Sequence, residues 1–110
     1  MQEERERRIG LNEAFFRSVN EQIDALTRDV AVDANLEIVC ECGSADCFDR
    51  LSVLRSDYER VRGDETLFIA VPGHEIPAVE DVVERVETHV VLRKRPGTPA
   101  GDVAVATAPR

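Results

Sequence analysis

The sequence has no tryptophan, one tyrosine and four phenylalanines in 110 residues. Large aromatic side chains contribute much of the buried area of a small domain, so their scarcity predicts a modest core that would gain from a staple such as a bound metal. The sequence also lacks any apolar run near the roughly 18 residues of a membrane span, and its first residues lack the apolar segment of a signal peptide. We therefore expect a cytoplasmic protein that does not contact a membrane.

Basic residues are few in relation to acidic ones. The chain has 14 lysines and arginines against 22 aspartates and glutamates, which gives a formal net charge of -8 at pH 7. A protein of this charge repels a phosphate backbone and has no field that would hold nucleic acid nonspecifically. The composition therefore excludes a general nucleic-acid-binding role.

Cysteine is scarce as well, and its three residues all lie in one short segment, residues 40–47, which we call the cysteine knuckle. An odd number of thiols in a reducing compartment indicates metal ligands or reactive thiols rather than a disulfide framework. A strand-forming run precedes the knuckle, so Cys40 and Cys42 should share one face of extended backbone. Gly43 then permits the reversal that brings Cys47 back, as in a metal knuckle.

A nitrogen ligand is available at His74, which a Pro-Gly turn presents just past an apolar run. Structural zinc takes four nitrogen or sulfur ligands at tetrahedral positions. We predict one structural metal per chain, zinc with iron as the open alternative, bound by Cys40, Cys42, Cys47 and His74. Two alternatives stay open, namely free buried cysteines that fill core space and redox-active thiols. His89 is a rival nitrogen ligand, although its place beside a valine run favours a half-exposed strand residue.

Residues 3–30 are predicted to form one helix that ends near Val32. Its apolar seam repeats with steps of three, four or seven residues. The seam comprises Ile9, Phe16, Val19, Ile23, Leu26 and Val30, with Asn12 as its polar member. This pattern favours packing on the protein's own sheet, with coiled-coil pairing as the alternative. Phe15 and Leu11 fall at the edge of the seam, where they would form a small exposed patch for a protein partner or a second copy of the chain.

The rest of the pattern predicts short strands and one short helix. A helix from Ser56 to Arg62 should begin with a Ser56–Glu59 capping box and end at a left-handed Gly63. Strands are expected from Leu36, at 50–54, as a buried central strand at 67–71 and, after a helical turn at 77–81, as a hairpin within 82–94, for which a helix followed by a strand is the alternative.

These elements predict an α+β fold in which a long N-terminal helix packs on a small, mainly antiparallel sheet with a short helix, stapled by the metal knuckle. Residues 1–95 should form this single domain. From residue 96 on, Gly, Pro, Ala, Thr and Asp predominate, so we expect a disordered tail over residues 96–110.

Several of these motifs also occur together in known sequences. They are Cys40-Glu41-Cys42-Gly43 with Cys47, the strand and helix from Leu51 to Arg62, Val71-Pro72-Gly73-His74-Glu75, and the strand from Val90 to Lys94. Over about residues 11–95 the chain resembles a family of small uncharacterised bacterial proteins, found largely in actinobacteria. The resemblance implies that the three cysteines and His74 form one unit, and it implies no particular activity.

The predicted function is that of a non-enzymatic, zinc-stabilised protein-interaction or regulatory module. The alternative is a redox or metal-dependent enzyme, or an electron carrier, that uses the Cys3His cluster. Four protein ligands leave zinc no open position for water, and the sequence shows no nucleophile–base pair and no phosphate-binding glycine loop. These features favour the non-enzymatic module.

Overall fold

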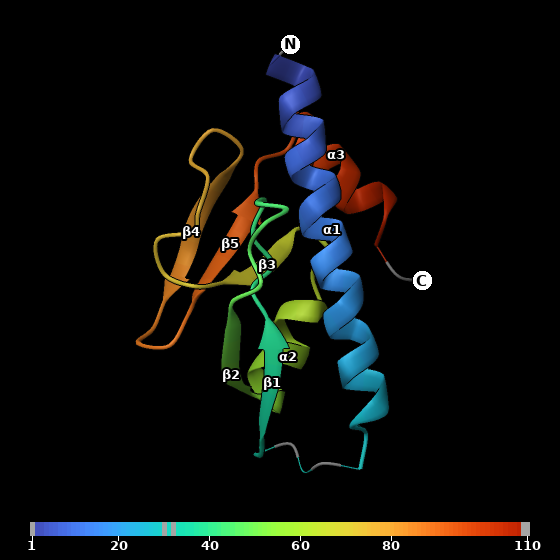
Figure 1. Ribbon diagram of the computed structural model, residues 1–110, viewed down its shortest axis with the longest axis vertical. Coiled ribbons are helices and arrows are strands. Elements are labelled where there is room, and N and C mark those ends of the chain that lie inside the picture. Colours follow the sequence, from blue (N-terminus) through green and yellow to red (C-terminus); the bar gives the residue numbers. More distant parts are fainter. Residues whose placement is uncertain (1, 30, 32, 109–110) are drawn as a thin grey trace.

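The long N-terminal helix lies beside two small antiparallel sheets (Figure 1). The computed structural model describes every residue except 1, 30, 32, 109 and 110. The elements in chain order are α1 (Gln2–Leu26), β1 (Asn35–Val39), β2 (Arg50–Leu54), α2 (Arg55–Arg62), β3 (Leu67–Ala70), β4 (Glu80–Arg85), β5 (Val90–Lys94) and α3 (Pro99–Ala106). One sheet pairs β1 with β2, and the other has the order β3-β5-β4. The predicted α+β fold class is confirmed, with the strands divided between two sheets.

The strands form where apolar residues fit a pleated backbone. In β1 and β2 alternate residues are buried, with Leu36 and Ile38 facing Leu51 and Val53 on one side of the pair. β3 is buried along its whole length, as expected, but β5 is the central strand of its sheet. The free edge of β3 is covered by the cysteine knuckle, because the Glu41 N–H donates to the Ile69 carbonyl at 2.8 Å.

The region from residue 80 to residue 94 forms the expected antiparallel hairpin. β4 pairs with β5 from Glu80 opposite Lys94 to Arg85 opposite Val90, with an irregularity between Val82 and Glu84. The alternative of a helix followed by a strand is therefore wrong here. β-Branched side chains in this segment take the strand conformation, which their stiffness favours.

The predicted capping box of α2 is wrong, and Gly63 is its C-cap as predicted but without the left-handed conformation. Leu54 is the N-cap residue and makes no side-chain cap hydrogen bond, and Gly63 has right-handed dihedral angles of φ -67° and ψ -13°. Glu59 accepts instead from the Arg55 side chain, whose Nε lies 3.0 Å from the Glu59 carboxylate. Arg55 also reaches Asp24 near the end of α1 at 2.8 Å. A buried arginine thus takes the carboxylate that the capping box would have used.

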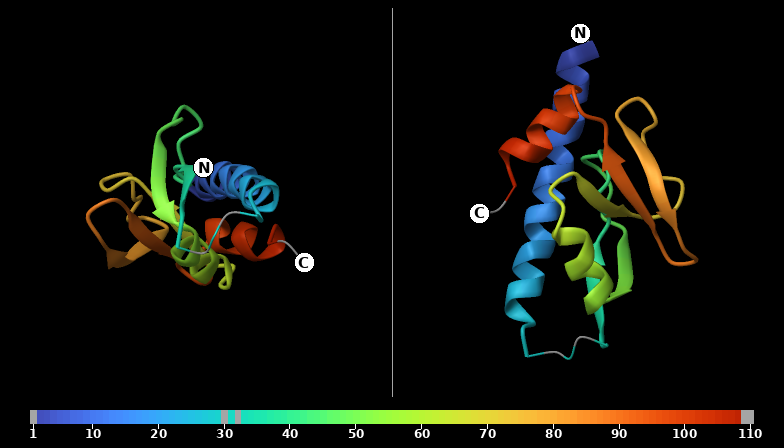
Figure 2. Two further views of the ribbon diagram at one scale, coloured as in Figure 1. Left: turned by 90° about the horizontal axis from the view of Figure 1, so that it is seen from below. Right: turned by 180° about the vertical axis from the view of Figure 1, so that it is seen from behind.

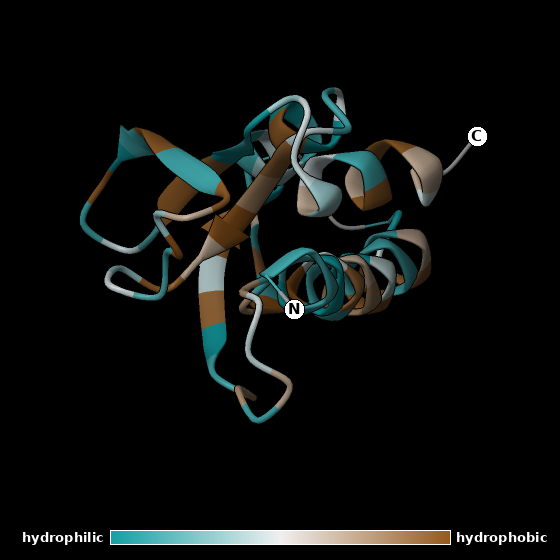
Figure 3. Cartoon of the chain, turned by 90° about the horizontal axis from the view of Figure 1, so that it is seen from above, coloured by the Kyte–Doolittle hydropathy of each residue, from teal (hydrophilic) through white to brown (hydrophobic). Residues whose placement is uncertain are grey.

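The buried face of α1 differs from the predicted seam. Phe16 and Ile9 are buried as expected, but so are Glu13, Arg17 and Asn20, which sequence periodicity placed off the seam. Figure 3 shows hydrophilic as well as apolar residues along α1. The helix ends at Leu26, which is 87% exposed, and not near Val32. Val30 and Val32 lie outside the described residues.

In the part of the chain that the structure describes, no helix is both long enough and apolar enough to cross a bilayer.

The segment predicted as a disordered tail contains a helix instead. Thr98 caps α3, since its hydroxyl accepts from the Gly101 N–H at 3.0 Å, and Pro99 occupies the first turn. Figure 2 shows α3 crossing α1. The contact is close at Gly10, where an added Cβ would lie 2.9 Å from the Ala100 Cα atom. The Gly- and Ala-rich composition that indicated disorder allows this tight helix crossing.

We expect Gly10→Ala to destabilise the protein. On an exposed helix face this change stabilises by about 1 kcal/mol, because alanine is the better helix former. Here the added methyl group would overlap the α3 backbone, so the sign should reverse in urea unfolding. Ser18→Ala, on the exposed face of the same helix, is the control and should be neutral or slightly stabilising. A stabilised Gly10→Ala variant would contradict the α1–α3 contact.

Candidate metal centre

Four side chains that sequence analysis grouped together meet at one place. The ligand atoms of Cys40, Cys42, Cys47 and His74 all lie within 4.8 Å of one another, in an arrangement that could hold a metal ion. Three come from the cysteine knuckle, and His74 comes from the turn after β3, where Gly73 has the positive φ of 92° that glycine readily adopts. None of the three cysteines is in a disulfide.

The knuckle is held between the two sheets by its backbone. The Cys40 N–H donates to the Asp49 carbonyl at 2.9 Å, which continues the β1–β2 ladder, and the next N–H, that of Glu41, donates to Ile69 in β3. Successive donors pointing in opposite directions define extended backbone. Cys40 and Cys42 therefore share one face, as predicted, and Glu41 points to the other.

The distances around His74 suit a tetrahedral ion. Its Nδ1 atom lies 3.6 Å from the sulfur of Cys40 and 3.6 Å from that of Cys47. A zinc tetrahedron with Zn–S near 2.3 Å and Zn–N near 2.0 Å has sulfur–nitrogen edges of about 3.5 Å, close to these distances. A single nitrogen lone pair can accept a hydrogen bond from only one of two equidistant thiols. One ion between the three atoms accounts for both distances.

Cys40 and Cys42 interact through a hydrogen bond that favours the thiolate form of Cys42 over that of Cys40. A hydrogen bond from Cys40 lowers the pKa of Cys42 to about 5, and the same interaction, together with burial, raises the pKa of Cys40. The Cys40 sulfur also accepts from the Val71 N–H at 3.2 Å. Donors aimed at sulfur stabilise thiolate, and thiolate is the form that binds metal.

The candidate centre is buried on one side and partly exposed to solvent on the other. Cys40 and Cys42 are buried against Ala70, Val90 and Leu92, which also fits the alternative of cysteines that fill core space. Cys47 and His74 are only partly buried. The His74 Nε2 atom faces the Asp49 carboxylate at 3.6 Å, an arrangement like that of carboxylates that orient metal-binding histidines.

Behind the knuckle lies the fully buried carboxylate of Glu41. It accepts from the Asn20 amide at 2.7 Å, from the Ile69 N–H at 3.1 Å and from Arg62 at 3.4 Å. Burial raises the pKa of Glu41, and the Arg62 charge opposes that shift. The charge is thus compensated on several sides, as a buried carboxylate requires.

A second buried charge cluster joins α1 to the hairpin. The Lys94 ammonium contacts the carboxylates of Glu13 and Glu80, and all three side chains are fully buried. Lys94 also lies over the ring of Phe68, 5.3 Å from its centroid. Burial raises the pKa of Glu13 from its ordinary 4.5 to about 7, although Lys94 opposes this shift. Two carboxylates around one ammonium carry an excess negative charge, which a proton on Glu13 removes.

Apolar side chains lie on the surface beside the centre. Phe48, next to Cys47, is 74% exposed, and Phe15 is 64% exposed. Both rings contact buried Phe16 edge to face, with centroids 6.4 Å and 5.6 Å away. Leu11 is exposed one helical turn before Phe15. We call Leu11, Phe15 and Phe48 the aromatic patch.

Sequence reasoning grouped the four side chains that the structure brings together and missed their surroundings. His89, the rival nitrogen, is buried elsewhere, with its Nδ1 atom 3.0 Å from the Thr88 hydroxyl oxygen, and is not in the group. The side chains around the group that sequence analysis did not anticipate are Asn12, Asn20, Glu41, Phe48 and Asp49. For Asn12, Asn20 and Glu41 the only signal in the sequence was a polar residue on an amphipathic helix or between two cysteines, which ordinarily indicates solvent exposure. Phe48 and Asp49 had no signal beyond following Cys47.

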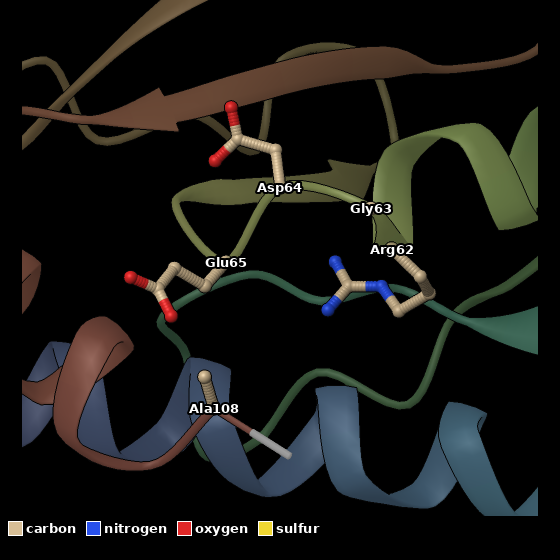
Figure 4. A pocket seen from close by; sticks show the side chains of 5 residues that line it. All are labelled: Arg62, Gly63, Asp64, Glu65 and Ala108. Atoms are coloured by element: carbon tan, nitrogen blue, oxygen red, sulfur yellow. The ribbon is translucent and has the colours of Figure 1, made fainter. Parts of the chain in front are cut away.

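A hollow of about 420 Å³ lies near the end of α2, lined by Arg62, Gly63, Asp64, Glu65 and Ala108. Figure 4 shows the charged side chains of Arg62, Asp64 and Glu65 around it. The Arg62 guanidinium donates to the Leu67 carbonyl at 2.5 Å as well as to Glu41. Arg62 is therefore bound to the back of the knuckle, and it supports the metal centre rather than a separate site.

Comparisons of the chain with protein-family models, curated proteins and solved structures found no match. The resemblance to an actinobacterial family stays a prediction, and the interpretation of the site rests on its geometry.

We expect Glu13→Gln to change how stability depends on pH. A carboxyl with a higher pKa in the folded than in the unfolded chain adds stability at low pH, and this contribution is lost as the pH rises through the folded-state pKa. The wild type should therefore lose stability relative to Glu13→Gln between pH 4.5 and about 7. Denaturant unfolding at several pH values measures the difference in unfolding free energy between the two proteins. Protonation of the thiols contributes equally to both and cancels from this difference.

Glu3→Gln, on the exposed first turn of α1, is the control and should follow the wild type at every pH. Parallel profiles for Glu13→Gln and wild type would mean that Glu13 is not protonated in this range.

Proposed function

We propose that this protein is a non-enzymatic, zinc-stabilised interaction module of the cytoplasm, with one structural zinc bound by Cys40, Cys42, Cys47 and His74. The observation that carries the proposal is the convergence of three sulfurs and one imidazole nitrogen with edge lengths of 3.6 Å at His74. This ligand set is typical of structural zinc sites, in which all four positions are filled by protein.

A structural metal fits the rest of the molecule. The knuckle lies between the two sheets, so an ion there would tie the β1–β2 pair to the turn that follows β3. Small domains with few aromatic residues gain much of their stability from such staples. Zinc binding in such a site would act directly as folding free energy.

The alternative is a redox or metal-dependent enzyme or an electron carrier. The lowered pKa of Cys42 and the partial exposure of Cys47 favour thiol chemistry. A filled tetrahedral shell counts against hydrolysis, because no position is left to activate water. Iron in place of zinc would give a coloured protein, whereas zinc gives a colourless one.

The aromatic patch supplies the interaction surface in this proposal. Two large exposed rings that contact the same buried phenylalanine are unusual, because they leave apolar area in contact with water. Asp46 and Asp49 lie within two residues of Phe48 in the sequence, and the chain has a net charge of -8. The partner is a second copy of the chain or another protein that covers the rings and meets α1.

One prediction of the proposed function concerns metal content. Protein purified without a metal-affinity tag should contain about one zinc per chain by elemental analysis. Cys42→Ala should lose the zinc and lower the melting temperature by well over a few degrees, because a buried ligand is removed from a folding-linked site. Ser44→Ala, in the same loop, is the matched control and should keep both.

Wild-type protein without a transition metal, whose three thiols react as fast as those of an unfolded chain, would refute the zinc site. Zinc at full occupancy in Cys42→Ala would show that the ion is bound elsewhere.

The second prediction concerns the aromatic patch. Phe15→Ser should leave the fold and zinc content intact and weaken self-association, because Phe15 is mostly exposed and its loss removes apolar contact area. Sedimentation at several concentrations compares it with wild type. Leu26→Ser is the control, since Leu26 is exposed on the same helix about three turns beyond Phe15.

A wild type that is monomeric at all concentrations would reject the homo-oligomer version and leave a different protein as the partner. If Phe15→Ser unfolds the chain, Phe15 belongs to the core and the patch is not an interaction surface.

A further inference from the structure

Helix α1 is hydrogen-bonded to the backbone of the cysteine knuckle on both sides of its first two cysteines. Asn20 reaches Val39, the residue before Cys40, and Asn12 reaches Gly43, the residue after Cys42. Both are side-chain to main-chain contacts between parts of the chain that are far apart in sequence. The segment that presents the two buried sulfurs is thus held at its two ends by one rigid helix.

The Asn20 amide makes the pair of hydrogen bonds with Val39 that a neighbouring strand would make. Its nitrogen donates to the Val39 carbonyl at 2.8 Å, and its oxygen accepts from the Val39 N–H at 2.8 Å. The nitrogen also donates to the Glu41 carboxylate at 2.7 Å. Asn20 is fully buried, so these bonds replace all contact with water. Loss of this side chain would leave a backbone donor, a backbone acceptor and a carboxylate oxygen each short of a partner.

Asn12 fixes the other end of the segment. Its amide nitrogen donates to the Gly43 carbonyl at 2.8 Å. Gly43 itself touches α1, since an added Cβ there would lie 2.5 Å from a methyl carbon of Ile9. The turn that sends the chain from Cys42 toward Cys47 is therefore formed directly on the helix surface.

We propose that Asn12 and Asn20 are positioning residues that couple metal binding at the knuckle to the docking of α1. The inference rests on the proposed zinc function. The helix holds the backbone on which Cys40 and Cys42 are spaced, so it pre-organises two sulfurs for the ion. Because such coupling is reciprocal, the bound ion in turn stabilises the helix against the sheets.

The coupling has a consequence for the aromatic patch. Leu11 and Phe15 belong to α1, whereas Phe48 follows the ligand Cys47, and buried Phe16 joins the two rings. The patch exists only while the helix is docked on a folded knuckle. Metal occupancy therefore controls whether the interaction surface is assembled.

The test compares zinc affinity and zinc release rate in variants of the full chain. Asn20→Ala should bind zinc about 10- to 100-fold more weakly, as is usual for residues that orient metal ligands. Asn12→Ala should bind it about 3- to 10-fold more weakly, which corresponds to one hydrogen bond. Both should release zinc faster to a coloured chelator. The visible spectrum of the cobalt-substituted protein should stay tetrahedral in both, because the four ligands remain.

Two controls separate positioning from general destabilisation. Gln22→Ala, exposed on α1, should match wild type in affinity. Val61→Ala, buried in α2, should lower the melting temperature without the same loss of zinc affinity, because Val61 has no bond to the knuckle. If Val61→Ala weakens zinc as much as Asn20→Ala at equal loss of stability, the asparagines are ordinary fold residues and the inference is wrong.

Unchanged zinc affinity and release in folded Asn20→Ala and Asn12→Ala would also overturn the coupling. If Asn20→Ala fails to fold, Asn12→Ala decides by the same criterion. A wild type that binds neither zinc nor cobalt is a different outcome, because then the proposed zinc function fails and the coupling fails with it.

Discussion

Extended backbone points adjacent side chains to opposite sides, and this constraint on Cys40, Glu41 and Cys42 determines much of the structure. Two sulfurs on one face of the knuckle require that the residue between them point to the other face, which is the interior. That residue is a glutamate and is fully buried. A buried carboxylate is tolerated only where donors surround it, so Asn20, Ile69 and Arg62 lie around Glu41. The backbone geometry that places the two sulfurs on one face therefore also buries a carboxylate, and this carboxylate needs polar partners in the interior.

Helix α1 contributes several polar residues to this interior. Glu13, Arg17 and Asn20 face inward, and each has partners there, with Arg17 donating to the carbonyls of Glu65 and Ala104. Such contacts are specific in geometry, whereas apolar packing allows the helix to slide or rotate. Breaking one partner of a buried charged pair is strongly destabilising, although the intact pair adds little stability by itself. We infer that this polar face sets the register of α1 on the sheets rather than the total stability.

The candidate metal centre, helix α1 and the aromatic patch are physically continuous in this molecule. The knuckle connects the two sheets through successive backbone bonds, α1 holds the knuckle through two asparagines, and the exposed rings sit at the junction of helix and knuckle. In the proposed zinc module, loss of the ion would loosen the same residues that present the patch. A small domain with few aromatic residues can in this way use one ion both to fold and to maintain a surface for a partner.

The sequence by itself determined the strands, the β4–β5 hairpin among them, and the grouping of three cysteines with His74. Strand periodicity and turn residues act over short spans, and the need of zinc for four nitrogen or sulfur ligands indicated His74 although it lies 27 residues beyond Cys47. Tertiary structure alone decided which face of α1 is buried, that residues 99–106 form a helix against Gly10, and that Glu59 pairs with Arg55 instead of capping α2. The first two depend on contacts between distant parts of the chain, and the third does so indirectly, because Arg55, four residues from Glu59, is itself buried against Asp24 of α1. A polar side chain can be buried wherever such a partner compensates its loss of water, and no local pattern carries that information.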